Sequence, residues 1–179
     1  MKKSSLTNTF TIPGDLDVVQ LLIENGANPS QFDLISAAAS GHYETVKFLL
    51  ENGANPNAQD GAALVGATEN EKEKVVLTLL QNGANPNLIP PPDNPLYMAA
   101  ALGYNGIVDD LLQHGARTDL LDEWDGTDAL AIAKIEENYD IEKAIQKERE
   151  KRKKRILELG PRSIIHRQRT GKFPQSMLI

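Results

Sequence analysis

Apolar residues recur at helical spacing in four similar stretches of the chain. Valine, leucine and isoleucine lie three and four positions apart in each stretch, with polar residues between them. The stretches begin at Val18, Val46, Val75 and Ile107 and read VVQLLI, VKFLL, VVLTLL and IVDDLL. This period is that of an α-helix with one apolar face. The pattern therefore predicts four helices, each of which must bury one side against something else.

The same short polar segment follows each of these helices. It reads ENGANP at residues 24–29 and 51–56, QNGANP at 81–86 and QHGART at 113–118. Its glycine falls where a helix ends and the backbone turns left-handed, a conformation that glycine adopts without a steric penalty. The four helix-stop glycines are Gly26, Gly53, Gly83 and Gly115. Four copies in register indicate an internal repeat.

A second, alanine-rich helix is expected before three of the four amphipathic helices. These stretches read LISAAASGH, LVGATENEK and LYMAAALGY and begin at Leu34, Leu64 and Leu96. From each leucine to the next stop glycine the distance is 19 residues. The connectors between units lengthen along the chain instead, from 8 to 14 residues. A helix pair of constant length with variable connectors is what stacked repeats require.

Together these features resemble the ankyrin family, whose repeat of about 33 residues is a β-turn followed by two antiparallel helices. The shared pattern is a Gly-His turn, a Val-Leu-rich second helix and a Gly-Ala-Asn end. The resemblance implies an all-α solenoid over residues 14–147, with short β-turn fingers and a C-terminal capping helix. We expect repeats at residues 14–30, 31–57, 58–87, 88–119 and 120–147, after an irregular N-terminal cap at 1–13.

Individual repeats depart from this pattern in ways that predict local structure. Repeat 3 is the weakest, because Gly66 occupies a helix interior at a cost of about 1 kcal/mol relative to alanine. In repeat 4, Asn94 is suited to cap the first helix and Pro95 to occupy its first position. Asparagine and proline together thus predict a well-defined start for that helix.

Repeat 5 lacks a stop glycine in its second helix. We expect Thr127 to cap its first helix and the second helix to cover the end of the stack with Ile141, Ala144 and Ile145. With no glycine to end it, that helix is expected to continue to Leu159. Residues 148–179 are thus predicted to be a basic helical extension and tail.

Charge is divided unevenly along the chain. The net charge of −6 combines −14 over residues 1–146 with +8 over residues 147–179. The run QKEREKRKKR at 146–155 has no apolar residue, so we expect it to be solvated and stabilised by pairs such as Glu150 with Lys154. An alternative hypothesis is nuclear localisation, or nucleic-acid or chromatin association through this basic run.

Residues suited to catalysis or metal binding are few. The chain has no cysteine and three histidines, and no hydrolase, nucleotide-binding or metalloprotease motif occurs. The acidic residues between 119 and 128 lack the spacing of a calcium loop. We therefore expect no enzyme activity, no cofactor and no bound metal.

The ankyrin resemblance implies partner binding through finger tips and the exposed surface of the first helices. The finger-tip positions are Pro90, Pro91, Glu123 and Trp124. The first-helix surface positions are Ala39, Ser40, Glu69, Asn70, Ala101, Leu102, Lys134 and Ile135, with Tyr104 beside them. For Trp124 two interpretations stand side by side: an exposed anchor for a partner, or an aromatic ring folded back on the capping helix.

The function expected from these observations is that of a protein-binding scaffold. The acidic body favours a partner with a basic surface, and we expect a monomer in the cytosol, with no membrane span. A further alternative, by analogy alone, is a secreted bacterial or viral effector that binds a host protein.

Overall fold

The computed structural model describes residues 16–26 and 31–170, and the side chains of these residues except 22, 31–33 and 159–170. Within this part the chain forms nine helices and no strand. The expected irregular cap at residues 1–13 lies outside the described residues. So do the last nine residues of the tail.

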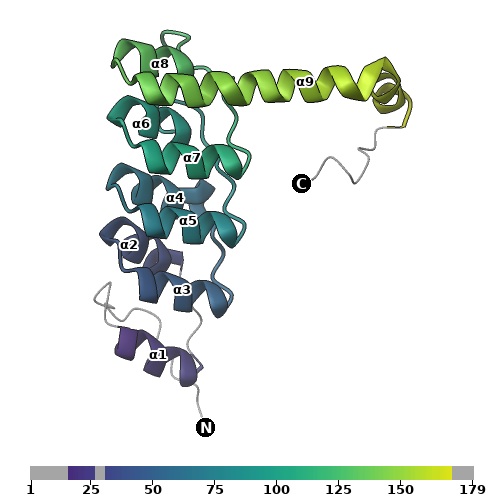
Figure 1. Cartoon of the computed structure of the whole chain (residues 1–179). Coiled ribbons are helices and arrows are strands. Elements are labelled where there is room, and N and C mark those ends of the chain that lie inside the picture. The colour runs from purple at the N-terminus through teal and green to yellow at the C-terminus, as the bar shows by residue number, and fades with distance from the viewer. Residues whose placement is uncertain (1–15, 27–30, 171–179) are drawn as a thin grey trace.

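The helices stand in two columns (Figure 1). The first column holds α2 (Gln31–Ser40), α4 (Ala58–Glu69), α6 (Pro95–Leu102) and α8 (Ala129–Ile135). The second holds α1 (Leu16–Glu24), α3 (Tyr43–Glu51), α5 (Glu73–Gln81), α7 (Asn105–Gln113) and α9 (Tyr139–Thr170). Each helix packs on its counterpart in the next repeat, and the two helices of a pair pack on each other. The predicted all-α solenoid is confirmed.

The core is a set of equivalent residues placed one above another along the stack. Three leucines that begin the apolar stretches of the first column, Leu34, Leu64 and Leu96, are almost completely buried. In the second column the same holds for two rows, Val46, Val76 and Val108, and Leu49, Leu79 and Leu111. Alanines of the first column fill the space between, so the helices approach closely. No single repeat encloses these residues, and stability therefore depends on contact between neighbours.

The predicted glycine stops are confirmed. Gly26, Gly53, Gly83 and Gly115 have φ between 84° and 89°. After α5, the Gly83 N–H donates to the Leu80 carbonyl at 3.0 Å and the Ala84 N–H donates to the Leu79 carbonyl at 2.9 Å. These bonds satisfy carbonyls that a helix end leaves without partners.

The packing of α4 against α2 explains why a glycine occupies position 66, which helix propensity alone does not show. It lies in α4, where a Cβ on Gly66 would sit 3.2 Å from the Cβ of Ala39 in α2. The absence of a side chain therefore lets these two helices approach closely, which compensates for the lower propensity of glycine.

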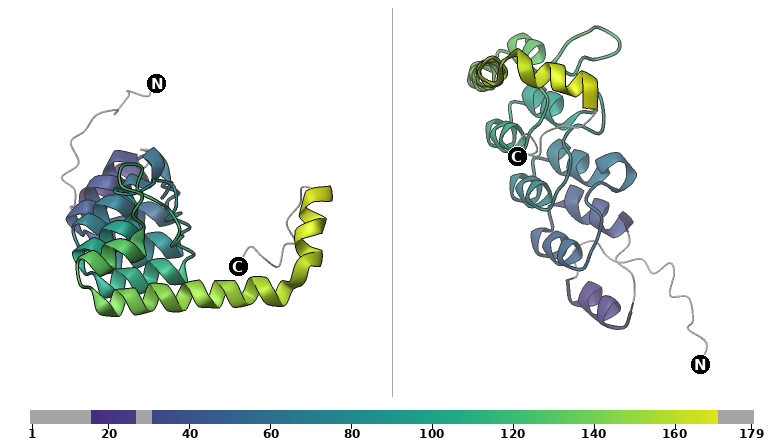
Figure 2. Two further views of the ribbon diagram at one scale, coloured as in Figure 1. Left: turned by 90° about the horizontal axis from the view of Figure 1, so that it is seen from above. Right: turned by 90° about the vertical axis from the view of Figure 1, so that its right-hand side faces the viewer.

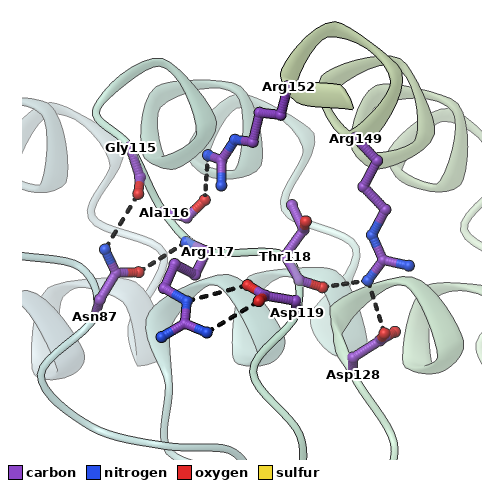
Figure 3. Close-up of polar contacts among 9 residues, drawn as sticks. All are labelled: Asn87, Gly115, Ala116, Arg117, Thr118, Asp119, Asp128, Arg149 and Arg152. Carbon is purple, nitrogen blue, oxygen red and sulfur yellow. Dashed lines mark hydrogen bonds and ion pairs between the residues drawn. The ribbon is translucent and has the colours of Figure 1, made fainter. Parts of the chain in front are cut away.

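An asparagine ladder joins successive repeats, and no helical period predicts it. The Asn57 side chain donates to the Gly83 carbonyl at 2.9 Å and accepts from the Asn85 N–H at 2.7 Å. One repeat later, Asn87 donates to the Gly115 carbonyl at 3.1 Å and accepts from the Arg117 N–H at 2.7 Å (Figure 3). Each asparagine fixes the distance between its own repeat and the next.

Replacement of Asn87 by alanine should lower the free energy of unfolding by about 1 kcal/mol. The variant leaves the Arg117 N–H and the Gly115 carbonyl to water, and both groups are near the surface. Urea unfolding followed by circular dichroism measures the change. Gln81→Ala, an exposed neighbour with no such bond, is the control; equal stability of both variants would show that the ladder contributes nothing.

The predicted cap of the first helix is confirmed in repeat 4 but wrong in repeat 5. Asn94 caps α6 through bonds from the Leu96 and Tyr97 N–H groups, with Pro95 at the first position, as expected. For α8 the expected cap was wrong: Asp128, and not Thr127, accepts from the N–H groups at the helix start. Thr127 lies one residue before the cap position, and its hydroxyl donates to the Asp125 carboxylate instead.

Helix α9 covers the end of the stack and then leaves it. Ile141 and Ile145 are buried and Ala144 packs against the core, as predicted. The helix was expected to end at Leu159 but continues to Thr170. Figure 1 shows that helix and stack form an L, and the view from above in Figure 2 shows the helix projecting sideways from the stack. We call residues 150–158 the arm.

Candidate functional site

The last finger loop, residues 121–127, is closed by hydrogen bonds from the buried Asp122. Its carboxylate accepts from the Trp124 N–H at 2.7 Å and from the Asp125 N–H at 3.2 Å. The Asp122 N–H donates to the Thr127 carbonyl at 2.7 Å, and the Gly126 N–H donates to the Asp122 carbonyl at 3.0 Å. Both sides of the loop are thus joined at its base.

A second set of bonds ties this loop to repeat 4. The Asp125 carboxylate accepts from the Thr127 N–H at 2.8 Å and from its hydroxyl at 2.7 Å. Because the Thr127 hydroxyl donates there, it accepts from the phenol of Tyr97, 3.0 Å away. Tyr97 is buried in α6. The bonds from Thr127 also hold the pKa of the Asp125 carboxyl below its ordinary value.

Trp124 stands at the tip of this closed loop with 92% of its surface exposed. It does not fold back on α9, so that interpretation is wrong. Glu123 beside it is exposed as well. A large apolar ring in full contact with water adds nothing to the packing of the described residues, and the loop beneath it is held in place.

The other predicted finger positions are not equivalent. Pro90 is exposed, whereas Pro91 is buried. The expectation that Pro91 contacts a partner is therefore wrong, because this residue is buried. Of the two prolines predicted to contact a partner, only Pro90 is therefore accessible on this connector.

The predicted first-helix positions lie at the C-terminal ends of their helices. Glu69, Asn70, Leu102, Lys134 and Ile135 are exposed. Ala39 and Ala101 are half-buried, and Ser40 is exposed. Tyr104 is half-buried and packs against the core, so only its edge remains accessible.

These helix-end residues and the finger tip form two separate groups. The finger loop precedes the N-terminal end of α8, and Lys134 and Ile135 lie at its C-terminal end. Seven residues of helix place the two ends about 10 Å apart. A partner that contacts both groups must therefore extend along the first helices of the stack.

The basic run of α9 is not wholly solvated, which corrects the prediction made from its composition. Arg149 donates to the Thr118 carbonyl and forms an ion pair with Asp128 at 2.7 Å (Figure 3). Arg152 donates to the Ala116 carbonyl at 2.7 Å and to Glu148 at 3.0 Å. Guanidinium groups can pack on backbone carbonyls without any apolar surface. These two arginines hold α9 against the segments on either side of the last finger.

The ion pairs of α9 also differ from expectation. The expected pair of Glu150 with Lys154 does not form. Glu148 instead pairs with Arg152 at 3.0 Å and with Lys151 at 3.6 Å, and Lys154 pairs with Glu158 at 3.9 Å. Glu148 is drawn toward the side of the helix that faces the stack, because Arg152 is fixed there.

A groove lies between the last finger and α9, and we call it the corner groove. Its lining residues are Arg117, Thr118, Asp119, Leu121, Asp128, Arg149, Arg152, Lys153, Ile156 and Leu157. On its wall Arg117 and Asp119 form a bidentate pair, with bonds of 3.0 and 2.9 Å. The bond from Arg117 holds the pKa of the Asp119 carboxyl below its ordinary value.

No arrangement suited to holding a metal ion occurs among the side chains that the structure describes. They contain no group of three or more His, Asp or Glu placed to hold a metal ion. The His114 Nδ1 donates to the Asp110 carbonyl at 2.8 Å, a structural bond at the end of α7. The same residues include no helix long and apolar enough to cross a bilayer.

Asp110 on α7 is the residue whose charge opposes folding. Burial raises the pKa of its carboxyl, and the charges of Glu73 and Asp109 add to the rise. A raised carboxyl pKa means that the folded state binds the proton more tightly than the unfolded chain. The resulting penalty is absent below the unfolded pKa of about 3.9 and is complete above the folded pKa.

Asp110→Asn should therefore be more stable than the unmodified protein at pH 7. The gain should vanish as the pH falls through the raised pKa toward pH 4, because the wild-type carboxyl is then neutral. Urea midpoints measured over this pH range test the expectation. Asp109→Asn, at the exposed neighbour, should give a smaller change; an unchanged Asp110→Asn midpoint at pH 7 would contradict the assigned penalty.

Comparison with known families agrees with this architecture. A model of ankyrin repeats, in three copies, matches residues 11–90. The matched segment consists of ankyrin repeats, and the all-helical solenoid supports an ankyrin-repeat protein. Ankyrin repeats are protein–protein interaction modules, typically without catalytic activity. A search of curated proteins returned no match. Beyond the matched segment, α6 to α9 of this ankyrin-repeat protein continue the same two columns.

Several residues of the ankyrin stack that organise the candidate surface were not predicted. Tyr97, Asp122 and the two docking arginines act through bonds to residues far away in the sequence or to the backbone. A signal existed for the ladder asparagines, since Asn57 and Asn87 both follow an Asn-Gly-Ala-Asn-Pro segment. The others have no repeated pattern from which they could be found.

Proposed function

We propose that this ankyrin-repeat protein is a non-catalytic binding module that docks a partner protein on repeats 4 and 5. The observation that carries the proposal is Trp124, 92% exposed on a loop that hydrogen bonds already hold in one conformation. A tryptophan contributes a large contact area when a partner covers it. Because the loop is ordered beforehand, less conformational entropy is lost on binding.

The charges around Trp124 favour a partner with a basic surface. Glu123 and Asp125 flank the ring and are exposed. A lysine or arginine of the partner is attracted to these carboxylates and can stack on the indole.

Binding at this surface should weaken as salt is added, because exposed charges are screened. We expect Glu123→Gln to lower the affinity by a few-fold at low ionic strength and to make no difference near 1 M salt. Isothermal titration calorimetry at several salt concentrations measures both effects, with a partner protein isolated by affinity capture on the unmodified chain. An affinity that ignores ionic strength would argue against a basic partner surface.

Site-specific photo-crosslinking tests where the partner sits. A benzoylphenylalanine at position 124 should form an adduct with the partner, and the same probe at Tyr139 should not. Tyr139 is an exposed aromatic at the start of α9, away from the finger loop, and is therefore the matched control. Equal adducts from both positions, or an adduct from position 139 alone, would exclude the finger as the docking surface.

A second candidate function is nucleic-acid association through α9. It is favoured by three basic residues of α9, Lys147, Lys153 and Arg155, which form no ion pair within the described part of the chain. Reversal of these three charges should abolish binding to a single-stranded RNA if this function exists. Truncation at Gln146 is a poorer test, because it also removes the docking arginines Arg149 and Arg152.

A further inference from the structure

The corner groove gathers exposed apolar residues on an otherwise charged part of the molecule. Leu121 of the last finger is 56% exposed, and Ile156 and Leu157 of the arm are 60% and 72% exposed. All three line the same groove. Isolated apolar residues on a surface need no explanation, but three that converge on one concavity mark a binding surface.

The groove-facing side of α9 is set by helical spacing. Arg149, Arg152, Lys153, Ile156 and Leu157 follow one another at intervals that keep them on one side of the helix. The arginines near the stack fix the floor by their bonds to the carbonyl groups of Thr118 and Ala116, between α7 and the last finger. The apolar pair lies further out, where the arm leaves the stack. The groove therefore exists before any ligand arrives.

The charge that remains in the groove, once its ion pairs are taken into account, is positive. Its two carboxylates are already engaged, Asp119 by Arg117 and Asp128 by Arg149. Lys153 has no ion-pair partner within the described residues. From residue 147 to 158 the helix carries seven basic and three acidic side chains. A ligand that covers the apolar residues is thus favoured if it also carries negative charge.

We propose that the corner groove is a second docking site, for an acidic peptide segment with apolar anchor side chains, such as an amphipathic helix with leucines on one face and carboxylates beside them. Its leucines cover Leu121, Ile156 and Leu157, and its carboxylates reach Lys153. This site differs from the Trp124 surface in place and in the sign of the charge that it selects. A nucleic acid would use the basic residues but leave the apolar ones exposed, which is why the peptide is favoured.

Fluorescence anisotropy with two labelled peptides tests the proposal. One is an 18-residue helix-forming peptide rich in glutamate, with leucine at every third or fourth position; the other has serine in place of each leucine and the same charge. The full-length protein should bind the leucine peptide at least about tenfold more tightly, as expected for buried apolar anchors. Leu157→Ser and Ile156→Ser should each remove most of that difference.

Two controls separate this site from the rest of the molecule. Leu21→Ser changes an exposed leucine of α1 at the far end of the stack and should leave peptide binding unchanged. Trp124→Ala should also leave it unchanged, so failure here and failure of the proposed function are distinguishable. Circular dichroism confirms that each variant folds.

Four results would each overturn the proposal. Equal binding of the serine peptide would reduce the site to unspecific charge attraction, and equal binding by Leu157→Ser and Ile156→Ser would place the peptide elsewhere. Sedimentation that shows a dimer, dissociated by those variants, would make a second copy of the chain the occupant. Loss of single-stranded RNA binding in the same variants, with no peptide bound by the unmodified protein, would make the groove part of a nucleic-acid surface.

Discussion

Trp124→Ala should weaken binding of the partner protein by about 30-fold or more, the loss that 2 kcal/mol represents for a central interface aromatic. The midpoint of thermal unfolding should stay within about 1 °C of the unmodified value, because the ring contacts water and not the core. Titration calorimetry with the captured partner and differential scanning calorimetry measure the two quantities.

Two further variants define what the tryptophan contributes. Tyr139→Ala, another exposed aromatic, should leave affinity unchanged. Asp122→Ala keeps the ring but removes the carboxylate that receives the Trp124 and Asp125 N–H groups, so it should weaken binding several-fold through a less ordered loop. Full affinity in Trp124→Ala would refute the docking role of the finger.

Asp128→Ala should lower the free energy of unfolding by about 2 kcal/mol. One part, about 1 kcal/mol, is the lost helix cap, since Asp128 accepts from the Leu130 and Ala131 N–H groups at 3.0 and 2.9 Å. The rest comes from the ion pair with Arg149 at 2.7 Å, whose side chains are mostly but not fully buried, so screening by solvent reduces its contribution. Urea unfolding followed by circular dichroism gives the value.

A double-mutant cycle separates these two parts. Arg149→Ala alone should destabilise less than Asp128→Ala, and the double variant should be more stable than the sum of the single effects implies. Asp119→Ala, which breaks an exposed ion pair with Arg117, is the control and should change stability little. Strict additivity of Asp128 and Arg149 would show that the pair contributes nothing beyond the cap.

The stack could be predicted from the sequence because its determinants repeat. A leucine that lies 19 residues before a stop glycine in three successive units specifies both helices and the turn that follows them. The buried rows of leucine and valine are the same positions seen in space. The one-residue error at the start of α8 arose where two adjacent residues, Thr127 and Asp128, can both cap a helix and only their other contacts decide between them.

The candidate surface was predictable only as a set of positions. The ankyrin resemblance placed Trp124 at a finger tip, but its exposure depends on the closed loop formed by Asp122, Thr127 and the distant Tyr97. The same limit explains the error on the basic run, because Arg149 and Arg152 bond to carbonyls rather than to apolar side chains. Contacts of this kind leave no period in the sequence.

Helix α9 runs without a break from the residues that cover the stack into the arm. From the buried Ile145 to residue 158 the helix extends about 20 Å without interruption. The packing of its first part in repeat 5 therefore fixes the direction of the arm. A ligand bound to the finger and a ligand bound to the arm are therefore held at a fixed angle to each other. A single ligand long enough to contact both the finger and the arm would bind its second site at a high effective concentration. Two separate ligands would be held in a fixed relative orientation.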